Sequence, residues 1–240
     1  MNKRIVFLSV LMFVSAAAFS QHVLLEQDVN ADTIPETVGH NQKKYTHLYV
    51  NYGFVFGANE GEGAEIRTGN SSQFAIGLRY KRRLSNFYAI GFDLSYNITT
   101  FHLKQDSAKI LPDTLLHDKE KFSGNNATLQ LYNRFNFGKS GNHIGRYLDL
   151  GGYGEWAFSV THYTKDTDDR AIALGAKATQ TTNKGLKYAA PFNYGLAARI
   201  GFGKMAVFGK YRLSDMFVSK YDYPELPRIV VGLEFGIINN

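Results

Sequence analysis

The residues best suited to chemistry in this chain are a few histidines with carboxyl or hydroxyl groups nearby. His162 lies in the stretch VTHYTKD, with threonines rather than a serine beside it, and His102 and His117 flank Asp106 and Ser107. Nucleophilic catalysis needs a nucleophile, a base and a residue that orients the base, all within hydrogen-bonding reach. None of these stretches has such a spacing. We therefore predict solvated histidines and no enzymatic activity.

Two short charged clusters have more ordinary explanations than a metal or nucleic-acid site. The acidic stretch KDTDDR at 165–170 lacks the glycine and the distal glutamate of a calcium-binding loop, so we interpret it as a solvated loop tip. The basic stretch RYKRR at 79–83 is divided between two faces if it forms a strand, because successive strand residues point to opposite sides. We predict no metal, no cofactor and no nucleic-acid partner.

Ten charged residues, two of them in RYKRR, share one property: each falls on the polar face of a segment in which polar and apolar residues alternate. They are Arg79, Lys81, Asp93, Arg134, Asp149, Glu155, Arg199, Lys210, Arg212 and Glu234. Unpaired charges inside a closed sheet would be costly, so we expect this set to interlock through ion pairs and hydrogen bonds. In particular, we expect Glu234 to anchor its strand to one or more of the arginines.

The segments that carry these charges begin at Tyr45 and read as strands. We place them at 45–57, 72–84, 87–101, 124–138, 146–163, 189–203, 204–214 and 228–238. Most are about ten to fifteen residues long, whereas strands in globular proteins usually have about five or six. Their number, about eight, is even, as in bacterial outer-membrane barrels.

The face opposite the charges is largely apolar. It carries Leu48, Val50, Tyr52, Phe54, Phe74, Ile76, Leu78, Tyr80, Tyr88, Ile90, Phe92, Leu94, Leu129, Leu131, Phe135, Trp156, Phe158, Val160, Leu196, Ile200 and Phe202. A soluble sandwich or lipocalin-like barrel would bury this face and leave the charges in water. A membrane barrel reverses the arrangement. We therefore expect the last segment, IVVGLEFGI at 229–237, to face lipid with its apolar side and to close the barrel.

Connection lengths alternate along the chain. Those at 85–86, 139–145 and 203–204 are short, whereas 58–71, 102–123, 164–188 and 215–227 are long and polar. Outer-membrane barrels pair short periplasmic turns with long outer loops, and an even strand number returns both termini to the periplasm. Aromatic residues near the segment ends fit the belts found at both membrane interfaces. These are Tyr45, Phe87, Tyr88, Phe137, Tyr147, Phe192, Tyr194 and Tyr211.

The N-terminal part of the sequence indicates export. Residues 1–20 combine a basic start, an apolar run and the small-residue end AFS before Gln21, which is typical of a removed signal peptide. We expect a periplasmic tail at 21–44, which lacks strand alternation, and the barrel at 45–240. The absence of cysteine excludes disulfides and a lipid-modified cysteine.

Together these patterns predict an all-β fold: a transmembrane antiparallel up-and-down β-barrel of about eight strands with a polar, side-chain-filled lumen. It would lie in the outer membrane of a Gram-negative bacterium, with both termini periplasmic and with outer-membrane lipid and lipopolysaccharide as partners. A lumen of this width is just filled by side chains, which favours a packed plug over a narrow ion path.

Motifs near both ends of the chain resemble a known family. KYRLSDMF (210–217), YPELPRIVVGLEFGI (223–237) and the signal end AAAFSQ are similar to the small outer-membrane β-barrel proteins of Bacteroidota, which include PorT-like proteins. The resemblance implies a non-enzymatic accessory or structural subunit of a type IX-like secretion or outer-membrane assembly complex. It brings no catalytic residues. Two alternatives stay open: a surface protein that binds ligands through its long outer loops, and a narrow pore.

Overall fold

The computed structural model describes residues 42–57, 63–137, 145–167 and 175–237, so the predicted signal peptide and most of the predicted tail lie outside the described residues. The described residues form nine strands: β1 (Lys44–Phe56), β2 (Ser72–Arg83), β3 (Tyr88–His102), β4 (Lys119–Phe137), β5 (Arg146–Asp166), β6 (Thr179–Lys184), β7 (Phe192–Phe202), β8 (Met205–Arg212) and β9 (Ile229–Ile237). In these ranges the one helix is the short 3-10 turn η1 (Ser219–Tyr221), and no helix is long and apolar enough to span a bilayer.

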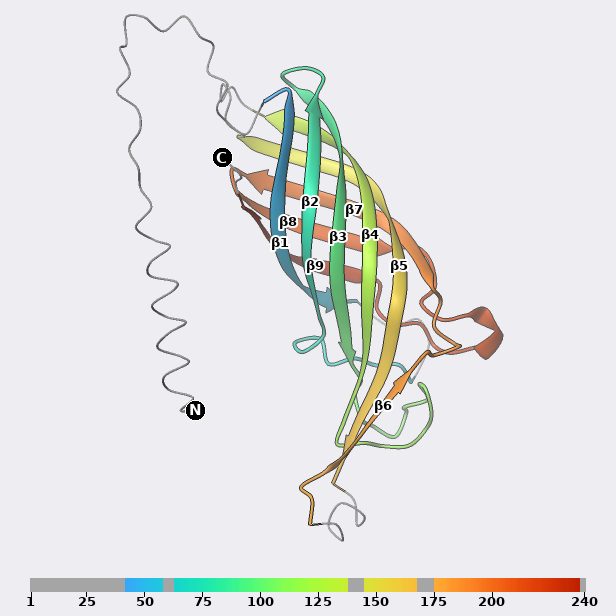
Figure 1. Cartoon of the computed structure of the whole chain (residues 1–240). Coiled ribbons are helices and arrows are strands. Elements are labelled where there is room, and N and C mark those ends of the chain that lie inside the picture. Colours follow the sequence, from blue (N-terminus) through green and yellow to red (C-terminus); the bar gives the residue numbers. More distant parts are fainter. Residues whose placement is uncertain (1–41, 58–62, 138–144, 168–174, 238–240) are drawn as a thin grey trace, which may run out of the picture. The chain divides into compact units, whose positions relative to one another are not determined.

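Eight of the strands form a closed antiparallel ring (Figure 1). Each strand pairs with its neighbours in chain order, β4 pairs with β5, and β9 returns to pair with β1. The pairing of β9 with β1 runs from Ile229 opposite Phe56 to Ile237 opposite Leu48, so IVVGLEFGI closes the ring as predicted. The predicted all-β, antiparallel, eight-stranded arrangement is confirmed.

The ninth strand, β6, was not predicted. It falls inside the connection at 164–188, which was expected to be a loop. In addition, β4 begins at Lys119 rather than at the predicted residue 124. The physical reason is that pairing between β7 and β5 stops at Trp156, which leaves the far end of β5 with a free edge that β6 takes up from Thr161 onward. The long hairpin of β4 and β5, with β6 beside it, therefore continues beyond the other strands (Figure 1).

The connections divide between the two ends of the ring as the sequence indicated. The short ones at 84–87 and 203–204 lie at the end that holds the first residue of β1 and the last residue of β9, and the third expected short connection, 139–145, lies almost entirely outside the described residues. The long connections gather at the opposite end (Figure 1).

Side chains on the ring alternate between an apolar outer face and a polar inner face. Every ring strand exposes at least three large apolar side chains outward, which makes the apolar band continuous around the ring. On β4 the outward residues toward the long-connection end are polar, namely Lys119, Lys121, Ser123 and Asn125, and beyond them Asn133 is the one polar outward residue. The band on β4 thus runs from Ala127 to Phe137.

The interior is capped at the long-connection end by an apolar cluster. Val55, Phe101, Phe122, Phe217 and Leu226 belong to it and are almost completely buried. The connections contribute part of this cap, so they fold over the mouth of the ring and bury apolar surface there. The polar interior lies below this cap.

Candidate functional site: the polar interior of the ring

The centre of the interior is a network of three arginines and three carboxylates. Arg79 donates to both oxygens of Asp93, at 2.7 and 2.9 Å, and to both oxygens of Glu234, at 2.6 and 2.9 Å. Arg134 makes the same paired contact with Asp149, at 2.7 and 2.8 Å. Paired contacts of this kind are the strongest geometry that a guanidinium offers to a carboxylate.

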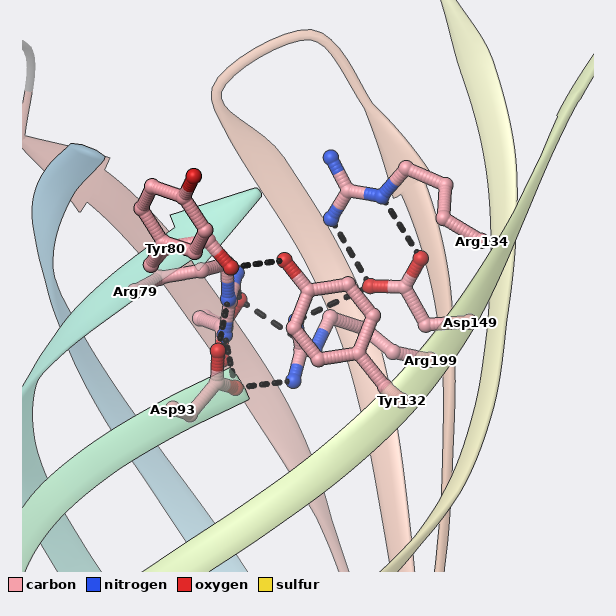
Figure 2. Close-up of polar contacts among 8 residues, drawn as sticks. Arg79, Tyr80, Asp93, Tyr132, Arg134, Asp149 and Arg199 are labelled. Atoms are coloured by element: carbon pink, nitrogen blue, oxygen red, sulfur yellow. Dashed lines mark hydrogen bonds and ion pairs between the residues drawn. The ribbon is translucent and has the colours of Figure 1, made fainter. Parts of the chain in front are cut away.

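Arg199 joins the two halves of this network. It donates to Asp93 at 2.7 Å and to Asp149 at 3.0 Å, and its Nε lies 3.4 Å from Glu234 (Figure 2). Because Arg199 is on β7 and Asp93 is on β3, this contact spans the interior rather than joining neighbouring strands. The six formal charges sum to zero, and each of the six residues is at most 3% exposed.

Tyrosine rings support the cations from the inner wall. Arg79 lies 4.3 Å from the centre of the Tyr49 ring and Arg134 lies 3.7 Å from that of Tyr147, while Tyr132 is within 5.9 Å of Arg79 and closer to two other arginines. Cations are attracted to the faces of aromatic rings, the more so where water is excluded. The tyrosines therefore add favourable contacts to the ion pairs.

Two of these tyrosines need a glycine opposite them. Tyr132 faces Gly91 on β3, and Tyr147 faces Gly201 on β7, each pair directly opposite across two strands. A Cβ at either glycine would overlap the tyrosine ring, so the missing side chain makes room for the ring to lie against the wall. Sequence reasoning missed this role, and Tyr147, predicted for an outer aromatic belt, is buried inside. That placement was wrong because Tyr147 is two residues from Asp149 on the same strand, so both side chains point to the inner face.

The other four predicted interior charges also point inward. Lys81 is fully buried near this network, whereas Arg212 lies near the cap and donates to Glu225 at 2.5 Å and to the Leu226 carbonyl at 3.0 Å. Glu155 is partly exposed and accepts from Asn126 at 2.5 Å, so it takes no part in the central network. Lys210 is buried and lies over the ring of Tyr153.

A second buried polar cluster lies at the long-connection end, and the sequence did not reveal it. Glu120 accepts from Lys109 at 2.7 Å and Gln105 at 2.8 Å, and its other oxygen lies 2.6 Å from His162 Nε2. His162 also stacks on Phe122. The prediction of a solvated histidine is wrong for His162, which is 5% exposed. Its carboxylate partner lay in a segment expected to be a loop.

This cluster joins the connection at 103–118 to the strands. His117 Nδ1 lies 2.8 Å from Asp166 at the end of β5, a second link that is half-buried. Among the described residues no group of three or more potential ligands could hold a metal ion. The contacts of Glu120 and Asp166 tie this connection to β4 and β5, and we call them the Glu120 clamp.

We predict that the clamp weakens in acid through Glu120, which lies beyond the apolar band. Burial raises the pKa of its carboxyl, but hydrogen bonds from His162, Lys109 and Gln105 outweigh burial and hold the pKa below its ordinary value. A depressed carboxyl pKa contributes stability above the unfolded value of about 4.3, and this contribution is lost as pH falls through the folded value. Hydrogen-exchange protection of 103–118 should fall over that range.

The variant Glu120→Gln isolates this effect. It should lower protection of 103–118 at neutral pH by about tenfold or more, because hydrogen bonds to a charged group contribute about 1.5–3 kcal/mol. It should also remove the acid dependence. Glu65→Gln is the control, since its ion pair with Lys104 is exposed. Equal protection in Glu120→Gln and the unchanged chain would contradict the clamp.

Comparisons with known proteins add no assignment. No protein-family model matches the chain, and a search of curated proteins returns no match.

Proposed function

We propose that this chain is an integral outer-membrane β-barrel that does not conduct and that serves as an accessory or structural subunit of an envelope complex. The observation that carries the membrane part is the continuous apolar band around a closed ring whose interior is charged. In water such a band would be an exposed apolar surface of a kind that soluble monomers rarely tolerate. In hydrocarbon it is the favourable surface, and closure satisfies the backbone groups of every ring strand.

The proposal of a sealed interior is supported by two features. The network of Arg79, Arg199 and their carboxylates crosses the ring, and the apolar cap lies above it. The void beside Arg199 and Glu234 has a volume of about 10 Å³, which is at the lower limit for a single water molecule. A hydrated ion would have to break several buried ion pairs to pass, which argues against the pore.

The subunit role follows from the resemblance to PorT-like barrels together with a sealed interior, since a barrel that carries nothing through its lumen acts through its surfaces. We propose a secretion complex of the type IX kind, or an outer-membrane assembly complex, as the setting. The short turns and the predicted tail at 21–44 would offer periplasmic surfaces to partners.

One purification tests both parts. The tagged chain, extracted from outer membranes in a mild detergent, should bring down a secretion or assembly component in near-equal amount. Reconstituted into planar bilayers, it should give no stepwise current. A chain that purifies alone would contradict the subunit role, and steady single-channel steps would contradict the sealed interior.

A surface-binding role is the second candidate, and one observation favours it. The connection at 103–118 is held by the Glu120 clamp yet presents Ile110, Leu115 and Leu116 to the outside, each at least 49% exposed. An ordered loop with exposed apolar side chains is suited to binding another molecule. Loss of a surface ligand on replacing Leu115 and Leu116 with serine would favour this role.

A further inference from the structure

Four lysines lie on the outer face of the part of β4, β5 and β6 that continues beyond the other strands (Figure 1). Lys119 on β4 is directly opposite Lys165 on β5, and Lys121 is two residues from Lys119. Lys184 on β6 is directly opposite Thr161, which is four residues from Lys165. Side chains that are directly opposite, or that are two or four residues apart on one strand, point to the same face of a sheet. The four lysines therefore share one surface, which we call the lysine face.

No carboxylate neutralises the lysine face. Within the described ranges none of its four ammonium groups makes a hydrogen bond or an ion pair, and Lys121 lies over the ring of Tyr163 with 5.0 Å to the ring centre. The two carboxylates next to these lysines in the sequence are engaged elsewhere. Asp118 accepts a hydrogen bond from a backbone N–H at 2.9 Å, and Asp166 contacts His117 at 2.8 Å.

The lysines repel one another. The Cβ atoms of directly opposite residues such as Lys119 and Lys165 are about 4.5–5.5 Å apart, and like charges in this arrangement are destabilising. His102, which is opposite Lys121 on β3, responds to the positive charge. Burial first, and then the cations Lys121, Arg67 and Lys119, hold the pKa of His102 below its ordinary value. A bound anion would relieve this repulsion.

The outer surface changes in a fixed order from the apolar band to the lysine face. Exposed aromatic residues lie at the edge of the band, namely Tyr96, Trp156 and Phe158. The next outward residues carry amide and hydroxyl groups: Asn125, Ser123, Thr100 and Thr161. The lysines follow. This order matches an amphiphile in which acyl chains, sugar hydroxyls and phosphates succeed one another.

The height of the lysine face above the band selects the kind of amphiphile. Lys184 is level with Ser123, four residues beyond Ala127, where the band on β4 ends, and Lys119 is eight residues beyond it. With a rise of about 3.4 Å per residue and a strand tilt of about 40°, these positions lie about 10 and 20 Å above the band. The headgroup layer of a phospholipid is about 5–8 Å thick. A taller phosphorylated head group is needed to reach Lys119.

We propose that the lysine face binds lipopolysaccharide, whose phosphorylated sugars extend above its acyl chains. The acyl chains lie against the aromatic residues at the edge of the band, and the sugars contact the hydroxyls of Ser123 and Thr161. The ammonium groups of the lysine face hold the phosphates as point charges. This inference rests on the membrane part of the proposed function and assigns one lipid to one place on the barrel.

Titration of the purified full-length chain in dodecyl maltoside with rough lipopolysaccharide in the same detergent tests the site. Calorimetry should show one saturable site whose affinity falls as sodium chloride is raised, because salt screens exposed charges. Lipopolysaccharide from which hydrofluoric acid has removed the phosphates should bind at least tenfold more weakly. Equal binding of the two forms would overturn the proposal. Displacement by an equal concentration of inorganic pyrophosphate would also overturn it, since the face would then recognise free phosphate rather than a lipid.

A double variant and a matched control assign the site to these residues. Lys119→Gln with Lys165→Gln should weaken binding about tenfold or more, since each lysine near an anionic membrane surface strengthens binding about fivefold. Without ligand this variant should keep or gain resistance to heat, because the like-charge pair is removed. Lys44→Gln with Lys204→Gln removes the same charge from exposed positions at the opposite end of the ring and should bind as the unchanged chain does. Equal affinity in the two double variants would contradict the lysine face.

Insertion into lipid is measured separately, by quenching of Trp156 fluorescence in vesicles with brominated acyl chains. Strong quenching together with phosphate-dependent binding supports both proposals. Strong quenching without such binding overturns the lipopolysaccharide site and leaves the membrane barrel standing. Absence of quenching contradicts the membrane barrel and this site with it.

Discussion

Replacing Glu234 with glutamine should lower the free energy of unfolding by about 3–5 kcal/mol, the usual cost of removing one partner from a buried ion pair. Glu234 accepts two hydrogen bonds from Arg79 and lies 3.4 Å from Arg199, so the substitution leaves the interior with an uncompensated positive charge. It would also detach the closing strand from the network. Urea titration of the chain folded in phospholipid vesicles measures the change.

The matched control is the same substitution at an exposed ion pair. Glu65 contacts Lys104 at 2.6 Å, but both side chains are about half exposed, and such pairs contribute about 0–1 kcal/mol. Glu65→Gln should therefore leave the midpoint nearly unchanged. Equal, small effects of the two substitutions would mean that Glu234 does not anchor the ring.

Introducing a charge on the outer band should have the second largest effect. Leu131 is 62% exposed near the middle of the band on β4. Leu131→Arg should cost about 2–4 kcal/mol in a bilayer, because the guanidinium must reach water from the hydrocarbon. In a water-soluble protein the same change at so exposed a position would alter stability by no more than about 0.5 kcal/mol.

Leu116→Arg provides the comparison. Leu116 is 58% exposed but lies in the connection at 103–118, outside the ring strands. The same substitution there should be nearly neutral in the same vesicle assay. If both leucine variants were neutral, the outer band would not be in contact with lipid.

The ring could be predicted because strand alternation is strong wherever one face is apolar. An ion pair between adjacent strands could also be predicted from the sequence, because a short turn at 84–87 places Arg79 opposite Asp93. For Glu234 the sequence predicted a contact with one or more of the interior arginines but could not specify Arg79, because the two residues are 155 positions apart and nothing local specifies their approach.

The errors lie where the apolar signal stops. Outward residues of β4 before Ala127 are polar, so neither face of 119–123 is marked as apolar and this segment was expected to be a loop. This concealed Glu120 and, with it, the burial of His162. The strand β6, TQTTNK, is polar along its length and almost entirely exposed, so it too lacks the alternation of apolar and polar residues that marks a strand. Its pairing is set by the free edge of β5.

The chain's single tryptophan allows the most direct test of the membrane proposal. Trp156 is 52% exposed on the outer face of β5, near the end of the band toward the long connections. In vesicles whose lipids carry bromine on the acyl chains, its fluorescence should be strongly quenched, more by bromines near the headgroups than by those at the bilayer centre. Aqueous iodide should quench it weakly. Strong quenching by iodide with none by brominated lipid would place the outer face in water and contradict the membrane barrel.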